Sequence, residues 1–156
     1  MRARLRTVIL LALATSAGLW AADDIRIGTW KLDVAKSKYS PGPPPKSSIV
    51  RFEPYGDNGV KVTVETVGAQ GGKTKHQYSA NYDGKDVPVT GDPNRDTVAL
   101  KRMDAYTLEY TNKKGGKVIG AYKEVVAKDG KSRTVTQKGA NPQGQPVNNV
   151  LVYDRQ

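Results

Sequence analysis

Hydrophobic and polar residues alternate with a period of two along most of the chain from residue 47 onward. Between residues 60 and 65, for example, three valines alternate with Lys61, Thr63 and Glu65. Such alternation is typical of strands with one buried face, and no window keeps a helical period for ten residues. The pattern predicts ten strands, at 28–34, 47–54, 60–68, 73–82, 86–90, 96–103, 106–112, 117–127, 132–138 and 147–154.

Short glycine-containing turns separate the predicted strands. Four of them contain a Gly-Lys pair, at 71–73, 83–85, 115–117 and 129–131. Glycine supplies the positive φ that tight hairpin turns require, so the strands are expected to follow one another as an antiparallel up-and-down meander. A meander of this size avoids exposed strand edges most simply when its sheet closes into a barrel. We therefore predict an all-β fold, a roughly ten-stranded antiparallel barrel, with a β-sandwich as the alternative.

The proline-rich segment at residues 40–45 interrupts the alternation between the first two predicted strands. Proline cannot donate a hydrogen bond to a neighbouring strand and favours an extended polyproline conformation. We interpret this segment as a strap that joins the two strands.

The N-terminal 21 residues have the layout of a cleaved secretory signal peptide. Arg2, Arg4 and Arg6 precede an apolar run at 8–14, which is followed by small residues at 15–18. The apolar run is shorter than the roughly 20 residues that span a bilayer. We expect a signal peptide at 1–21, a single β-barrel domain at 22–156 without a transmembrane segment, and a periplasmic or secreted location. An uncleaved N-terminal anchor is the alternative.

Composition narrows the classes of chemistry. The chain has no cysteine, which excludes disulfides, thiol catalysis, zinc–thiolate sites and a lipid anchor at the cleavage point. The formal net charge is +10, and three of the 25 basic residues lie in the predicted signal peptide. The excess of basic over acidic residues in the rest of the chain is explained either by a need for solubility or by binding to an anionic envelope polymer. No basic cluster is interleaved with aromatic residues, so we expect no nucleic-acid partner, and we expect a monomer.

The sequence contains no residue pattern that strongly indicates a catalytic or metal site. His76 is the only histidine, and without cysteine it cannot build an ordinary zinc site. Residues 92–96 resemble the start of a calcium loop, but Thr97 replaces the expected glycine and Arg95 places a cation inside, so an Asx turn is favoured. Four glutamates lie on different strands, mostly at polar positions, namely Glu53, Glu65, Glu109 and Glu124. We predict no catalytic residue, metal or cofactor, with a hydrolase as the alternative.

Tyrosine is the most suggestive residue type, with eight copies against one phenylalanine. Inside a barrel, tyrosine offers apolar area and a hydroxyl, which suits an amphipathic ligand. Packing of a filled barrel is the alternative. The candidate ligand-binding residues are His76, Tyr78, Tyr82, Arg102, Tyr106, Tyr110, Tyr122, Arg133 and Tyr153.

The first predicted strand opens with Gly28-Thr29-Trp30, which resembles the opening motif of the lipocalins. With the following Lys-Leu it also resembles the first strand of the intracellular fatty-acid-binding proteins. The resemblance implies that Trp30 plugs the closed end of a barrel and that an arginine near the last strand packs across its ring. Arg155 takes that role here, so Gly28, Trp30 and Arg155 are the expected residues of barrel closure.

The whole chain after the signal peptide resembles exported bacterial lipocalin-like (calycin-type) β-barrel proteins that have no assigned activity. The resemblance lies at 28–33, 37–42, 82–85, 89–93, 129–137 and 147–150. Together with the lipocalin-like motif and the tyrosines, it makes an exported binding module for a small apolar or amphipathic ligand the leading hypothesis. The alternative is a structural or interaction protein with a filled barrel, whose basic surface docks on anionic envelope polymers.

Two departures from the fatty-acid-binding proteins affect the expected site. Their two lid helices are replaced by the strap at 40–45, and their Arg-x-Tyr carboxylate motif is incomplete, because Leu151 stands two residues before Tyr153. Arg102 and Arg133 are the candidates to replace the missing arginine.

Overall fold

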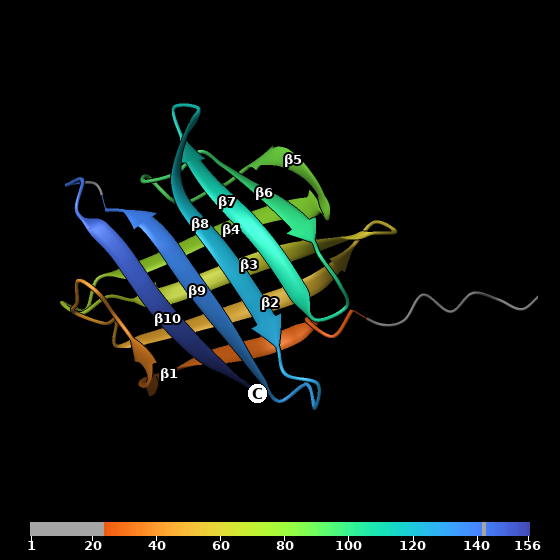
Figure 1. The fold of residues 1–156 in the computed structure, drawn as a ribbon, viewed down its shortest axis with the longest axis horizontal. Coiled ribbons are helices and arrows are strands. Elements are labelled where there is room, and N and C mark those ends of the chain that lie inside the picture. The colour runs from red at the N-terminus through yellow and green to blue at the C-terminus, as the bar shows by residue number, and fades with distance from the viewer. Residues whose placement is uncertain (1–23, 142) are drawn as a thin grey trace, which may run out of the picture.

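A computed structural model describes residues 24–141 and 143–156, and ten antiparallel strands make up most of these residues (Figure 1). The expected signal peptide at 1–21 lies outside them. The strands are β1 (Gly28–Lys38), β2 (Ser47–Tyr55), β3 (Gly59–Val67), β4 (Lys73–Asn81), β5 (Asp83–Pro88), β6 (Thr97–Arg102), β7 (Thr107–Lys114), β8 (Lys117–Val126), β9 (Ser132–Ala140) and β10 (Pro146–Arg155). Within this described part of the chain, no helix has the length and hydropathy to cross a membrane.

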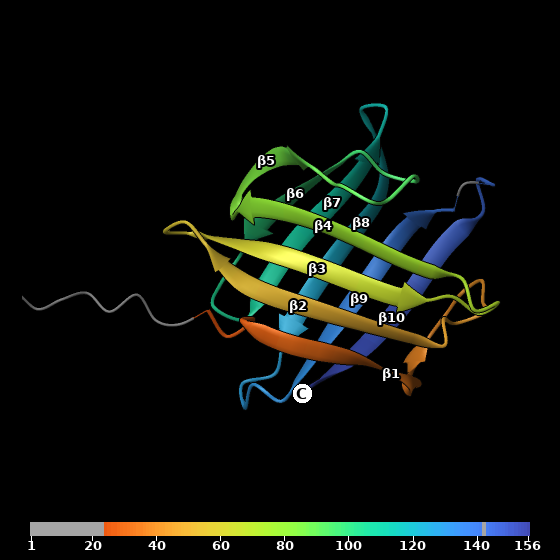
Figure 2. The same cartoon turned by 180° about the vertical axis from the view of Figure 1, so that it is seen from behind.

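The strands form one sheet in the order β4-β3-β2-β1-β10-β9-β8-β7-β6-β5. Each strand therefore lies beside its neighbour in sequence, and the pairing of β1 with β10 joins the first and last strands. Figures 1 and 2 show the sheet curled on itself, with β7–β10 forming one wall and β1–β4 the other. The predicted all-β, ten-stranded antiparallel meander is confirmed, because each strand pairs with its neighbour in sequence and β1 pairs with β10.

The barrel is nearly closed, with a gap between the edge strands β4 and β5. One isolated bridge crosses it, in which Gln77 and Thr90 exchange backbone hydrogen bonds of 3.0 and 2.9 Å. This bridge attaches the loop between β5 and β6 to β4. Gly91, with φ of +82°, lets the loop approach so closely that a Cβ would collide with the Lys75 carbonyl oxygen. The loop is thus docked at the open end of the barrel.

Most predicted strand limits agree with the structure to within three residues. β1 ends four residues later than expected, at Lys38, and β5 is shifted at both ends. β5 was expected at 86–90 but begins at Asp83, which pairs with Lys101. A register irregularity between Asp83 and Asp86 explains the difference, since it breaks the two-residue alternation on which the prediction rests. The strap at 40–45 does lie between β1 and β2, and the Ser40 carbonyl accepts a 2.8 Å hydrogen bond from the Asn148 amide of β10.

Candidate ligand-binding cavity

The closed end of the barrel is built around Trp30, which is fully buried. Trp30 pairs with Arg155 in the β1–β10 ladder, and the Arg155 guanidinium carbon lies 4.2 Å from the Trp30 ring centroid. Arg155 also donates to the carbonyls of Ile27 at 2.7 Å, Gly130 at 2.6 Å and Ile25. The guanidinium thus ties the last strand to the start of β1 while it covers the indole face.

Gly28 makes this approach of Arg155 sterically possible. A Cβ at this position would lie 2.8 Å from Arg155 Nη1, and φ is +130°, a backbone conformation that side chains rarely tolerate. The structure therefore brings Gly28, Trp30 and Arg155 together at the closed end.

A buried ion network lies directly above this plug. Glu124 is 1% exposed and accepts hydrogen bonds from Arg26 Nε at 2.9 Å and Arg133 Nη1 at 2.5 Å. The Arg133 guanidinium carbon also lies 4.3 Å from the ring centroid of Tyr153 and 4.8 Å from that of Phe52. Two cations and one carboxylate are therefore held rigidly among aromatic rings.

Sequence reasoning missed both Arg26 and Glu124. Glu124 was assigned with the scattered, mostly polar-facing carboxylates, whereas it points inward. A signal existed, because along β8 Glu124 shares its phase with Tyr122 and Val126, and Val126 is 1% exposed. Arg26 precedes the first strand, so no alternation marks it.

A second cluster at the closed end holds Tyr82 and Arg102. The Tyr82 hydroxyl donates to Asp24, Arg102 Nη2 lies 2.7 Å from Asp24 Oδ2, and the Arg102 guanidinium carbon is 3.9 Å from the Tyr82 ring centroid. Burial alone would raise the pKa of the Asp24 carboxyl. The Tyr82 hydrogen bond, the Arg26 backbone amide and the two arginine charges outweigh burial and lower it. Tyr82 and Arg102 therefore serve the closed end and do not line the main cavity.

The main cavity has a volume of about 360 Å³ and lies between the ion network and the open end. Apolar side chains from both walls line it near the network, among them Val50, Phe52, Val62, Leu108 and Val135. The sequence-predicted residues that line it are His76, Tyr78, Tyr110, Tyr122, Arg133 and Tyr153. Tyr106 is half-buried in the turn before β7 and lies outside the lining.

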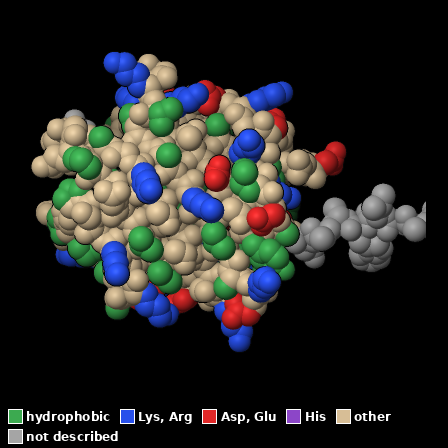
Figure 3. Space-filling model, viewed as in Figure 1, with side chains coloured by type: hydrophobic (Ala, Val, Ile, Leu, Met, Phe, Trp, Pro, Cys, Tyr) green, Lys and Arg blue, Asp and Glu red, His purple; other side chains and the backbone are tan. Residues whose placement is uncertain are grey.

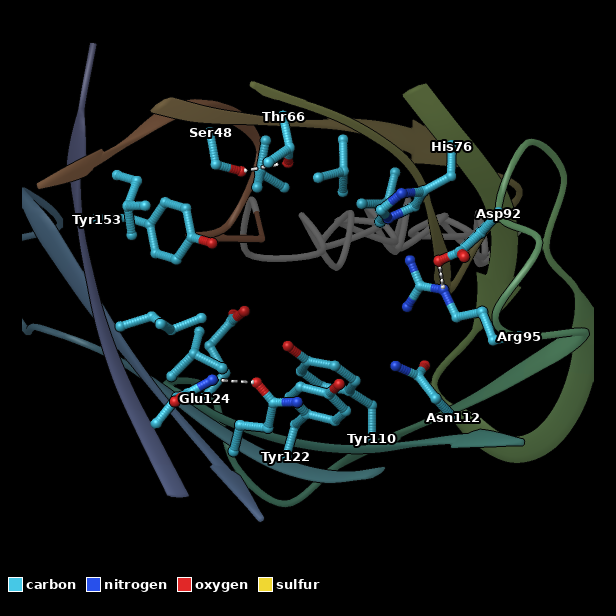
Figure 4. A pocket seen from close by; sticks show the side chains of 18 of the residues that line it. Ser48, Thr66, His76, Asp92, Arg95, Tyr110, Asn112, Tyr122, Glu124 and Tyr153 are labelled. Atoms are coloured by element: carbon cyan, nitrogen blue, oxygen red, sulfur yellow. Dashed lines mark hydrogen bonds and ion pairs between the residues drawn. The ribbon is translucent and has the colours of Figure 1, made fainter. Parts of the chain in front are cut away.

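Tyrosines form much of one wall of the cavity (Figure 4). Tyr110 of β7 and Tyr122 of β8 are register partners, with ring centroids 4.5 Å apart and planes inclined by 4°. Burial raises the pKa of Tyr78 to about 12 and that of Tyr110 further above its ordinary value. The hydroxyls therefore stay protonated near neutral pH and present neutral donors and acceptors to the cavity.

The mouth carries His76 from β4 and Asp92 and Arg95 from the docked loop between β5 and β6 (Figure 4). The Asp92 carboxylate accepts a 2.9 Å hydrogen bond from the Asn94 amide, so the predicted Asx turn is present. The pKa of His76 is lowered to about 4 by burial and by the Arg95 charge, against the opposing influence of Asp92. His76 is therefore neutral near pH 7.

Two polar groups at the mouth lack partners within the described residues. Arg95 Nε lies 2.9 Å from Asp92 Oδ2, but the alignment is too poor for a hydrogen bond, and Arg95 forms none with any described residue. Asn112 is 4% exposed, and its Oδ1 also has no partner. Both side chains point into the cavity (Figure 4). Neither Arg95 nor Asn112 was a predicted site residue. The only signal in the sequence was that Arg95 interrupts the segment at 92–96 that resembles a calcium loop.

The geometry gives the hydrolase alternative no catalytic pair in the described ranges. No hydrogen bond there joins His76 to a hydroxyl or carboxylate, and both Glu124 oxygens are engaged by arginines. The Ser48 hydroxyl is bonded to that of Thr66, at 3.0 Å. Between residues 24 and 156, Pro142 aside, no group of three histidine or acidic side chains could hold a metal.

Comparison with solved structures identifies the fold. A point mutant of the fluorescent protein UnaG gives a TM-score of 0.58 at 16% identity, covering 85% of this chain and 96% of that mutant chain. Wild-type UnaG gives 0.55 at 15% identity, covering 83% and 96%. A zebrafish ileal bile acid-binding protein complexed with cholic acid gives 0.48 at 12% identity, covering 85% and 99%.

No protein-family model matches the sequence, and comparison with curated protein sequences gives no significant match. The structural likeness therefore speaks for the fold alone. The chain adopts a nearly closed, ten-stranded antiparallel barrel whose fold is similar to that of UnaG.

Proposed function

We propose that this protein is an exported binding module that holds a small amphipathic molecule inside its barrel. The observation that carries the proposal is the interior cavity of about 360 Å³. Ligand sites typically measure about 300–1,000 Å³, so the cavity lies at the small end of that range. A barrel that served only as a scaffold would fill this space with side chains.

The distribution of side chains in the cavity suits an amphipathic ligand. Its inner part is lined by apolar groups such as Phe52 and Leu108, and its mouth by His76, Arg95 and Asn112. Burial of apolar ligand surface contributes about 25 cal/mol per Å², while a few polar groups fix orientation. A ligand with an apolar body and one polar end would match both parts.

Export is the second element of the proposal. It is supported by the arginine-led N-terminal segment, which has the layout of a signal peptide. Fractionation of the native host should find the protein in the periplasm or medium, with an intact mass that lacks residues 1–21. A full-length mass in the cytosol would contradict export without affecting the cavity.

The docking alternative has weaker support. Lysine and arginine side chains are scattered over the face seen in Figure 3, with acidic side chains between them. An anionic polymer is bound best by a continuous basic surface, because screening in salt limits isolated charges.

Native mass spectrometry of the protein purified from its own host tests the binding proposal directly. We expect an added mass of a small molecule that disappears on denaturation. The purified protein should also enhance the fluorescence of 1-anilinonaphthalene-8-sulfonate. Val64→Trp should abolish this enhancement, because Val64 lines the cavity.

Val125→Trp is the matched control, because Val125 is 42% exposed on the outer surface. This variant should keep the fluorescence response of the wild type. The proposal fails if the native protein carries no added mass and both variants respond to the dye alike.

A further inference from the structure

Arg95 has an unusual position for a charged side chain. It belongs to the loop between β5 and β6, which Gly91 and the Gln77–Thr90 bridge hold against β4. Its side chain is only 11% exposed and points into the cavity (Figure 4). A guanidinium carries five N–H donors, and none of them forms a hydrogen bond with a described residue. These donors are therefore free for a ligand.

The carboxylate beside Arg95 does not use those donors. Asp92 directs one oxygen to the Asn94 amide, and its other oxygen meets Arg95 only at the poorly aligned Nε. The two terminal nitrogens of the guanidinium, which match a carboxylate in fork geometry, remain available. His76, the other titratable group nearby, is neutral near pH 7.

The charges deeper in the cavity do not repel an anion. Glu124 is the carboxylate of the inner part, and Arg26 and Arg133 both hydrogen-bond to it. Arg26 also contacts Asp24, which pairs with Arg102, so three arginines face two carboxylates and the cluster has a positive balance. An anionic group at the mouth therefore meets the terminal nitrogens of Arg95, which Asp92 contacts only at Nε, and a net positive charge behind them.

Asn112 sets a second requirement for the ligand, besides the anionic group that Arg95 favours. It lies on β7 opposite Val98 of β6, a strand that begins two residues after Arg95. Its unpartnered Oδ1 is an acceptor, which a carboxylate cannot satisfy. The complementary group on the ligand is a hydroxyl or N–H donor. Without such a donor, Asn112 Oδ1 stays buried with no hydrogen bond to replace the one it loses to water.

We propose that the cavity takes an organic acid whose carboxylate is bound by Arg95 at the mouth and whose neighbouring hydroxyl or N–H donates to Asn112. The apolar body of this acid packs against the Tyr110–Tyr122 wall and the apolar residues below. This inference rests on the proposed binding function and names the class of ligand for that cavity. The acid group faces the open end, beside the docked loop.

Three matched probes test the inference by isothermal titration calorimetry on the mature chain. They are 3-phenyllactate, its methyl ester, and 3-phenylpropanoate, which lacks the hydroxyl. We expect 3-phenyllactate to bind at least tenfold more tightly than the ester, since a charge-assisted pair is lost. The acid without the hydroxyl should bind about fivefold more weakly than 3-phenyllactate, since Asn112 is left unpaired.

Two variants assign the effects to residues. Arg95→Gln should reduce 3-phenyllactate affinity to that of the ester and leave ester affinity within twofold. Asn112→Leu should remove the preference for the hydroxyl while keeping the preference for the acid over the ester. Arg51→Gln is the control, because Arg51 is exposed on the outer face of β2, and it should change nothing.

The inference is overturned if acid and ester bind equally, if Arg95→Gln leaves the acid affinity unchanged, or if no probe binds at millimolar concentration. These outcomes are distinct from failure of the proposed function. A co-purified molecule in native mass spectrometry, together with dye binding that Val64→Trp abolishes, would keep the binding function while rejecting this class of ligand.

Discussion

The closed end and the mouth of this barrel both bury arginine side chains, but they use them differently. At the closed end, Arg26 and Arg133 each donate to Glu124 at 2.9 Å or less, and Arg133 lies against aromatic rings. At the mouth, Arg95 forms no hydrogen bond with a described residue, and Asn112 keeps a buried acceptor unpaired. At the closed end, hydrogen bonds anchor each arginine to a carboxylate, whereas at the mouth no hydrogen bond with a described residue anchors Arg95.

This difference separates residues that stabilise the fold from residues that await a ligand. One nitrogen each of Arg26, Arg102 and Arg133 also lacks a partner, yet each side chain is hydrogen-bonded to a carboxylate through another nitrogen. Removing part of an anchored buried ion pair is strongly destabilising. Removing an unanchored group should cost little stability and much affinity, as expected of a site that departs from local consistency for function.

Glu124→Ala should give the largest loss of stability, about 3–5 kcal/mol, because it leaves two buried guanidinium groups without their carboxylate. Urea denaturation monitored by tryptophan fluorescence would measure the loss. Glu109→Ala is the control, because Glu109 is exposed on β7, and surface changes of this kind shift stability by less than about 0.5 kcal/mol. A loss below about 1 kcal/mol for Glu124→Ala would mean that the closed end is not the stabilising centre.

Arg155→Met should give the second largest loss in the free energy of unfolding, about 2 kcal/mol. Methionine keeps an apolar stem beside Trp30 but loses the cation over the ring and the donors to the three carbonyls. Thermal unfolding would measure the change, and Arg51→Met serves as an exposed control. Ligand affinity should be unchanged, because Arg155 lies outside the main cavity. A joint loss of stability and affinity would show that the two ends are coupled.

The sequence was sufficient for the barrel because alternation and glycine turns are local signals. Trp30 and Arg155 were recognised as a pair only because a resemblance joined the two ends of the chain. The ion network was missed because Arg26 and Glu124 are 98 residues apart and Arg26 belongs to no strand. The alternation predicted that Tyr82 faces inward, but it could not show that Tyr82 lies at the closed end of the barrel, because a period of two gives the face of a strand and not the end.

The mouth of the cavity was not predictable for a related reason. Arg95 lies in an irregular loop, where no period tells whether a side chain points inward. Its placement depends on the contact of Gly91 with the β4 backbone, a tertiary feature. Residues 92–96 were recognised as unusual, but as an incomplete cation site, whereas the structure shows a cation of the protein itself directed into the cavity.

The stability of the protein should fall at acidic pH, because the folded state disfavours the protonated form of His76 at the mouth. Its folded pKa is about 4 against an ordinary value of 6.5, so between these values the unfolded chain binds a proton that the folded chain does not. Stability is therefore full above pH 6.5 and falls as the pH drops from 6.5 to 4. Allowing for partial exposure and solvent screening, the loss is about 1–2 kcal/mol.

His76→Gln should flatten the stability profile between pH 6.5 and 4, as measured by urea denaturation at several pH values. Carboxyls with a lowered pKa, such as Asp24, lose their contribution at more acidic pH and do not produce this slope. An unchanged slope in the variant would show that His76 is solvated and that the mouth is wetter than the structure indicates.

Arg95→Gln should have the smallest effect on stability, and for that reason it distinguishes the two ends most sharply. Arg95 forms no hydrogen bond with a described residue and is held by its 2.9 Å ion pair with Asp92. Its removal costs that ion pair but also relieves a desolvated charge, so we expect a change within about 1 kcal/mol of zero in urea denaturation. The same variant should lose at least tenfold in affinity for the acid probe. A loss of stability above about 1 kcal/mol would contradict this interpretation, since Arg95 would then act as Arg133 does, as part of the frame of the barrel. A large loss of affinity with little change in stability is the result expected of a ligand-directed arginine.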